Sequence, residues 1–314
     1  MGDRIVFLDY ARTFALFLVV FAHLYSVDSD VKLYVYAFHM PFFFFVSGYL
    51  HKDVDMFQLV KKMAKRMLVP FCFFLFIGFL FHVMLRQGFP MGVLKGSIKG
   101  MVLGTVIEAN DILWFLLALF FTRIIGNAFI KRVWLGLLFV LLLVILTWNY
   151  NIFYLGSSLM ALPFFLCGYY GKEYLTILFQ NKKLCVFIGI ACALCSFIIS
   201  NINGKVSMAG RCFGNTPNEW INFSLFYLNG IIGTLMLLSV SAMFFRESKI
   251  ANIVSKSSIS IVGLQYIPII IWMKTVGLNQ SYIFSFFYSI LIIAIAVFFH
   301  YLVQKKSNWL LGGK

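Results

Sequence analysis

The stretch VFLDYARTFALFLVVFAHLYS, residues 6–26, is long and apolar enough to cross a membrane as one helix. Crossing the hydrocarbon core takes about 20 mostly apolar residues. A cleaved signal peptide would be shorter and would end in small residues. This stretch contains Asp9 and Arg12 and continues into SVDSD instead. We therefore expect a first membrane span over 6–26.

The rest of the chain has the same character. Of its 314 residues, 62% are hydrophobic and 12% are charged, whereas soluble domains have about 45–50% and about 25%. We expect an all-α, polytopic membrane helical bundle that forms a single domain over residues 1–314. The fourth of its ten spans is expected to be short. The ten spans are placed at 6–26, 32–50, 68–86, 112–126, 133–149, 155–171, 184–201, 222–245, 257–273 and 282–303.

The charged residues gather between these spans. The formal charge of +15 comes from 26 Lys and Arg against 11 Asp and Glu. With the N-terminus in the cytoplasm, the segments on that side hold 18 Lys and Arg and the opposite segments hold 7. Cytoplasmic loops carry such an excess, so the charge indicates topology rather than nucleic-acid binding. An even number of spans places both termini in the cytoplasm.

The first span carries an unusual polar stripe. Asp9, Arg12 and His23 follow helical steps of three and four residues, so they share one face. Ionisable groups inside a span are costly and are functional candidates by default. Asp9 and Arg12 can also form a purely structural pair at the cytoplasmic interface. His23 lies about 16 Å along the helix axis from Arg12, and its structural alternative is a hydrogen-bonded core histidine.

The second span contains HMPFFFFVSGY at 39–49. Pro41 is expected to break the helix locally. His39 lies at about the same membrane depth as His23, so the two histidines can share a site. Alternatively, His39 only satisfies backbone groups that Pro41 leaves open. Ser47, in the same segment, is a candidate supporting residue.

Two further groups of residues are candidates for ligand binding. A basic cluster that includes Lys62, Lys65 and Arg66 precedes LVPF and can hold phosphates, or it serves only as a topology signal. Trp114 can stack on a ligand or lie in an interfacial aromatic belt. The outer connections at 87–111 and 202–221 are candidates for acceptor contacts, or are mobile connectors. No metal site is expected from the cysteines, which lie mostly in apolar stretches.

Together these segments resemble the acyltransferase-3 family, membrane enzymes that transfer acyl groups, usually acetyl, to cell-envelope sugars. The resemblance rests on Arg12 and His23 within LDYARTFALFLVVFAH, on HMPFFFFVSGY, and on RMLVPF at 66–71, LWFL at 113–116 and PFFLCGYYGK at 163–172. It is strongest toward the fucose 4-O-acetylase-like branch. The family's Arg-x-x-Arg is reduced here, because Met63 precedes Arg66 by three residues, and Gln265 stands where the family often has His.

The resemblance implies a membrane O-acetyltransferase in the bacterial inner (cytoplasmic) membrane, surrounded by membrane lipids. Its donor would be acetyl-CoA or another acyl-CoA, with no bound cofactor, and its acceptor a sugar or lipid-linked glycan. Joined to the helical geometry, it assigns catalysis to His23 and Arg12. It assigns acyl-CoA binding to Arg12, Lys62, Lys65, Arg66 and Trp114, with Asp9, His39 and Ser47 in support. A polysaccharide or small-molecule transporter, or a non-catalytic assembly partner, is the alternative.

Overall fold

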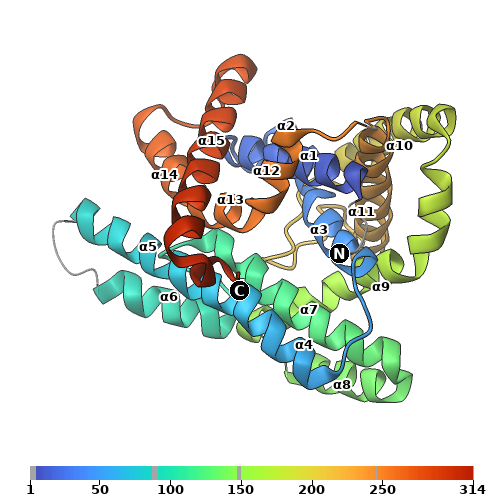
Figure 1. Cartoon of the computed structure of the whole chain (residues 1–314), viewed down its shortest axis with the longest axis horizontal. Coiled ribbons are helices and arrows are strands. Elements are labelled where there is room, and N and C mark those ends of the chain that lie inside the picture. Colours follow the sequence, from blue (N-terminus) through green and yellow to red (C-terminus); the bar gives the residue numbers. More distant parts are fainter. Residues whose placement is uncertain (1–4, 87–90, 147–149, 245, 314) are drawn as a thin grey trace.

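The regular secondary structure of the described chain is helical apart from one isolated β-bridge between Ser207 and Cys212. In hydrocarbon the backbone N–H and C=O groups have to bond within the protein, which a helix achieves. The structure, a computed structural model, describes residues 5–86, 91–146, 150–244 and 246–313. Figure 1 shows an all-α arrangement, as predicted. Its α-helices are α1 (Val6–His23), α2 (Asp30–Tyr36), α3 (His39–Tyr49), α4 (Met56–Met63), α5 (Val69–Arg86), α6 (Met91–Leu103), α7 (Trp114–Lys131), α8 (Val133–Leu146), α9 (Leu155–Leu178), α10 (Lys182–Asn203), α11 (Glu219–Ala242), α12 (Lys249–Lys256), α13 (Ser258–Leu264), α14 (Tyr266–Thr275) and α15 (Tyr282–Ser307).

Nine segments of the described chain are long and apolar enough to cross a membrane, and each overlaps a predicted span. The remaining predicted span corresponds to α8, an apolar helix of 14 residues. α7 and α9 run in the same direction. Near the starts of the two helices, Ser158 of α9 donates to the Ala118 carbonyl of α7 at 3.1 Å. Further along, Asn127 of α7 and Phe165 of α9 both contact His51. The chain therefore crosses the bundle once more between the end of α7 and the start of α9, and α8 lies in this return.

The prediction that the fourth span is short is wrong. It covers 21 residues, Asp111–Lys131, and α8 is the short one. The helix continues past residue 126 because its polar side chains find partners inside the protein. Thr122 donates to the Ala118 carbonyl at 2.7 Å, and Asn127 lies 3.1 Å from the His51 ring nitrogen.

The second span is broken, as Pro41 predicts. The break falls at Ala37 and Phe38, between α2 and α3, and Phe38 has a non-helical φ of −136°. Pro41 then lies in the first turn of α3, where a missing N–H is tolerated. This break places His39 at the start of α3.

α3 is nearly enclosed by its neighbours, and almost all of its residues are buried. It crosses α9 at very short range. A side chain at Gly48 would collide with the Phe165 backbone, and one at Gly168 would collide with the Phe45 backbone. The crossing therefore requires glycine on both helices, in the manner of small-residue packing between membrane helices.

The described part of the predicted outer connection, residues 91–111, is largely helical, which composition did not indicate. It contains α6, a helix of 13 residues beside α5 (Figure 1). Gly100 lowers helix propensity, but here it lets the chain at Val106 approach the helix closely. The Ser97 hydroxyl accepts from the Ala109 N–H at 2.9 Å. Tertiary contacts thus stabilise a helix that local propensity does not favour.

Candidate functional site

Two predicted histidines meet in one cavity. His23 ends α1 and His39 begins α3, and both line a cavity of about 290 Å³, called the histidine cavity below. Tyr36, at the end of α2, lies between them. Its ring centroid is 5.7 Å from that of His23 and 4.7 Å from that of His39. The break in the second span creates this arrangement, because it turns α2 and α3 around the end of α1.

Backbone hydrogen bonds fix the tautomers of the uncharged rings. Nδ1 of His23 lies 2.6 Å from the Val19 carbonyl, and Nδ1 of His39 lies 2.9 Å from the Val35 carbonyl. A carbonyl oxygen only accepts, so Nδ1 carries the proton in each ring and Nε2 is left as an acceptor. Nε2 of His23 accepts from the Tyr36 hydroxyl at 3.2 Å. His39 therefore bonds to the carbonyl of Val35 in α2. The carbonyl that Pro41 leaves without a backbone donor is a different one, that of Ala37.

Other polar groups surround the histidines. Lys32 lies 5.1 Å from the Tyr36 ring centroid and donates to the Tyr25 carbonyl at 3.3 Å. Asp111 and Gln265 also line the cavity. Asp111 accepts from the Ile107 N–H at 3.2 Å, which ties the start of α7 to the preceding loop.

Both outer connections reach this cavity. Residues 207–209 contribute from the connection at 202–221, and Asp111 contributes from the end of 87–111. Residues 87–90 of that connection lie outside the described part of the chain. Trp114 also lines the histidine cavity, with its ring 6.0 Å from that of Tyr154. The structure thus separates Trp114 from Arg12, Lys62, Lys65 and Arg66, with which it is predicted to bind acyl-CoA.

A second cavity, of about 650 Å³, contains three arginines and is called the arginine cavity below. Arg12 comes from α1, Arg66 from the segment after α4, and Arg123 from α7. The positive charges of Arg66 and Arg12 both act on Arg123. No acidic side chain is among the described residues that line this cavity. Clustered guanidinium groups of this kind are able to bind an anion through charge-assisted hydrogen bonds.

Local helix geometry positions Arg66. Pro70 has no N–H to donate to the Arg66 carbonyl one turn earlier. The chain from Ala64 to Leu68 widens accordingly into a π-helical turn, a distortion that is frequent at functional sites. Gly312 packs against the Arg66 backbone, where a side chain would come within 2.7 Å of its Cα. The C-terminal segment therefore borders the arginine cavity.

Arg123 is not among the residues predicted for the site. Its position at the end of the short fourth span made it look like a loop charge. The structure places it inside a longer helix, where its Nε is buried and has no hydrogen-bond partner among the described residues. The sequence did contain a signal for Arg123, because it is an ionisable group within an apolar run. That signal is recognisable only when the span is taken to continue to Lys131, as α7 does.

The other predicted basic residues lie outside this cavity. Lys62 and Lys65 are exposed and do not line it. The charge of Asp9 acts on Arg12, which agrees with their predicted pairing. Ser47 does line the arginine cavity, and its buried hydroxyl has no hydrogen-bond partner among the described residues.

A serine–histidine pair adds another polar group to the arginine cavity. The hydroxyl of Ser260 on α13 lies 2.8 Å from Nδ1 of His300 on α15. Ser260 is fully buried, and His300 lines the cavity. The pair holds the imidazole in place beside the arginines. Gln265, near Ser260 in sequence, lines the other cavity instead.

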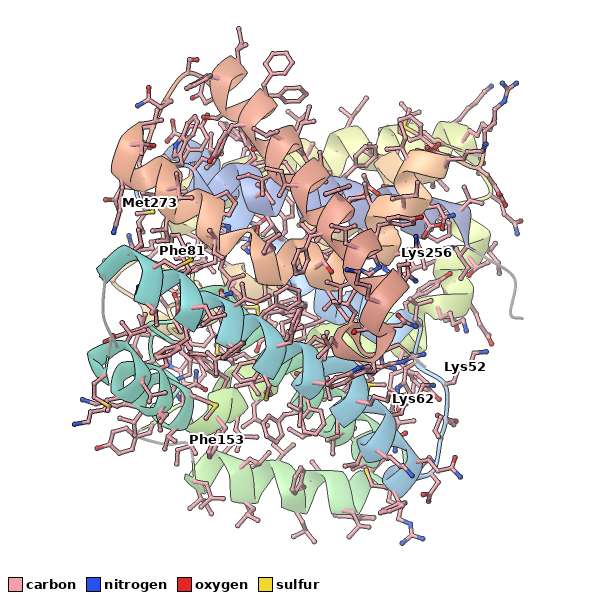
Figure 2. All side chains as sticks on the ribbon, turned by 60° about the vertical axis from the view of Figure 1, so that its left-hand side comes forward. Lys52, Lys62, Phe81, Phe153, Lys256 and Met273 are labelled. Carbon is pink, nitrogen blue, oxygen red and sulfur yellow. The ribbon has the colours of Figure 1, made fainter. Side chains whose placement is uncertain are left out.

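The two cavities lie toward opposite ends of the bundle and meet in the middle. In Figure 2, Lys256 of the arginine cavity is at the right and Met273 of the histidine cavity is at the left. Three residues line both cavities: Phe43, Phe115 and Val262. These three side chains therefore stand between the arginines and the histidines.

A family model described as an acyltransferase domain, of the acyltransferase 3 type, matches residues 5–301. The match covers every helix named here up to the last turns of α15. No curated protein and no solved structure matches the chain.

Proposed function

We propose, because the chain belongs to the acyltransferase 3 family of membrane acyltransferases, that it moves an acetyl group from acetyl-CoA to a sugar hydroxyl. The acceptor would be a cell-envelope sugar or glycan precursor in a bacterial inner membrane, as in the fucose 4-O-acetylase-like branch. One observation carries this proposal: an arginine cavity and a histidine cavity meet at three shared residues. Such an arrangement lets a donor and an acceptor approach from opposite ends of the bundle.

The donor belongs in the arginine cavity. Acyl-CoA carries its phosphates at one end and its thioester at the end of a long flexible arm. Arg12, Arg66 and Arg123 would bind the phosphates through charge-assisted hydrogen bonds. Lys62 and Lys65, exposed outside the cavity, would attract the anion toward it. The basic excess on this side of the predicted topology favours a cytoplasmic opening.

The acceptor belongs in the histidine cavity. Its hydroxyl would replace Tyr36 at Nε2 of His23 and give its proton to that nitrogen as the oxygen attacks the thioester carbonyl. The C–S bond then breaks, and the CoA sulfur leaves as a thiol with the proton from His23. Once displaced from Nε2, the Tyr36 hydroxyl can donate to the developing oxyanion. His39 packs against the Tyr36 ring, with centroids 4.7 Å apart.

The test is acetyl transfer by the purified protein in proteoliposomes. These are supplied with radiolabelled acetyl-CoA and with envelope glycans extracted from a strain that lacks the gene. We expect labelled glycan, identified by mass spectrometry, from the wild type and from a Phe187→Ala control in the exposed face of α10. His23→Ala should give almost none. Movement of glycan across the bilayer without any acetyl transfer would identify a transporter and refute the proposal.

A further inference from the structure

The junction between the two cavities is apolar, although both cavities are lined by polar groups. Phe43 comes from α3, Phe115 from α7 and Val262 from α13. The two phenylalanine rings pack with centroids 5.6 Å apart and an interplanar angle of 57°. Phe115 is 8% exposed and Val262 is 7% exposed. Three helices thus place three apolar side chains where the linings of the two cavities overlap.

This junction has little freedom to widen. Phe115 also packs against Phe44, with ring centroids 5.4 Å apart, and Phe44 is fully buried. Val262 follows Ile261, which is also fully buried. Closely packed interiors yield only slightly to an extra methylene group. A group that passes between these side chains must therefore be small, or it must displace buried rings.

We propose that Phe43, Phe115 and Val262 form an acyl-selecting constriction that admits a short acyl chain to the histidines and excludes longer ones. The inference rests on the proposed function, because it assumes that an acyl donor reaches across the junction. The acyl group is the apolar end of such a donor, so it enters the junction first. Its methyl group would contact the two rings and the valine side chain as it passes, while the phosphates stay with the arginines.

Chain-length discrimination in such a site has a known scale. One methylene more or less in a hydrophobic pocket changes kcat/KM by about 10- to 200-fold. The wild type should therefore prefer acetyl-CoA to butyryl-CoA by at least about tenfold. Val262→Ala, which removes two methyl groups from the constriction, should raise the butyryl-to-acetyl ratio of kcat/KM about tenfold or more. Phe43→Leu, which replaces a ring by a smaller branched side chain, should shift this ratio in the same direction.

The experiment measures kcat/KM for acetyl-, propionyl-, butyryl- and octanoyl-CoA with each variant in proteoliposomes, with folding checked by thermal stability. Val186→Ala on the exposed face of α10 is the matched control and should leave all ratios at wild-type values. Val262→Phe narrows the junction, and it should depress acetyl transfer while the affinity for CoA itself stays unchanged.

The outcomes separate the two proposals. If folded Val262→Ala and Phe43→Leu transfer acetyl groups with wild-type ratios for the longer donors, the constriction is refuted and the proposed function stands. If the wild type transfers no acyl group from any of the four donors, the proposed function fails, and the constriction fails with it. A selective gain for butyryl- and octanoyl-CoA in the widened variants, but not in Val186→Ala, supports the constriction.

Discussion

Replacement of Arg123 by methionine separates donor binding from stability. Methionine keeps a long apolar stem and a high helix propensity, so α7 should be retained. In the ligand-free protein, Arg123 is repelled by Arg66 and Arg12, and its buried Nε has no partner among the described residues. Removing it should therefore leave the Tm of the ligand-free protein unchanged or slightly higher. If Arg123 instead stabilised the ligand-free protein, its replacement would lower the Tm.

The affinity for the donor, in contrast, should fall. A hydrogen bond to a charged group contributes about 1.5–3 kcal/mol, and each 1.4 kcal/mol corresponds to about a factor of ten in Kd. Arg123→Met should thus weaken acetyl-CoA binding by about 10- to 150-fold. Arg132→Met, at the exposed end of the same helix, is the matched control and should have no effect.

The assay is equilibrium binding of radiolabelled acetyl-CoA to the detergent-purified protein at low and at high salt. Added salt should weaken wild-type binding more than Arg123→Met binding, because the variant has lost one of the charges that salt screens. A Kd for folded Arg123→Met within about twofold of the wild type, well below the loss of one such bond, would refute the assignment of the arginine cavity to the donor phosphates.

Three further predictions follow from the same structure. His23→Ala should lower single-turnover acetyl transfer by about 10²- to 10⁴-fold with acetyl-CoA binding retained, and His39→Ala should be milder; more than about a tenth of the wild-type rate in folded His23→Ala excludes it as the base. Arg66→Ala alone should account for most of the loss of donor affinity in the Lys65→Ala, Arg66→Ala double variant, since Lys65 does not line the cavity; equal effects of both single variants would contradict this. Burial, assisted by the positive charge of Arg123, lowers the pKa of His51 below its usual 6.5, so folding favours the neutral ring and stability falls as the pH drops below about 6.5. His51→Gln cannot take up this proton, and its Tm should fall less than that of the wild type between pH 7.5 and 5; parallel curves would show that His51 contributes nothing.

Much of the fold follows from apolar run length and from proline. The spans could be located because hydrocarbon requires continuous apolar helices, and the break between α2 and α3 because Pro41 cannot complete the helical hydrogen bonds. α6 could not be predicted, since its glycines have low helix propensity and its stability comes from contacts with the chain at 105–109. Local propensity contains no information about such contacts.

The candidate site, too, could be predicted from the sequence only in part. Arg12 and His23 share one face of one helix, so sequence spacing alone relates them. Tyr36, Arg123 and His300 lie on three other helices, and their distances to those two residues depend on how the helices cross. Those crossings are set by close contacts such as Gly48 of α3 against the backbone of α9. A sequence period describes one helix at a time, so it identifies the stripe on α1 but not the residues that other helices bring to it.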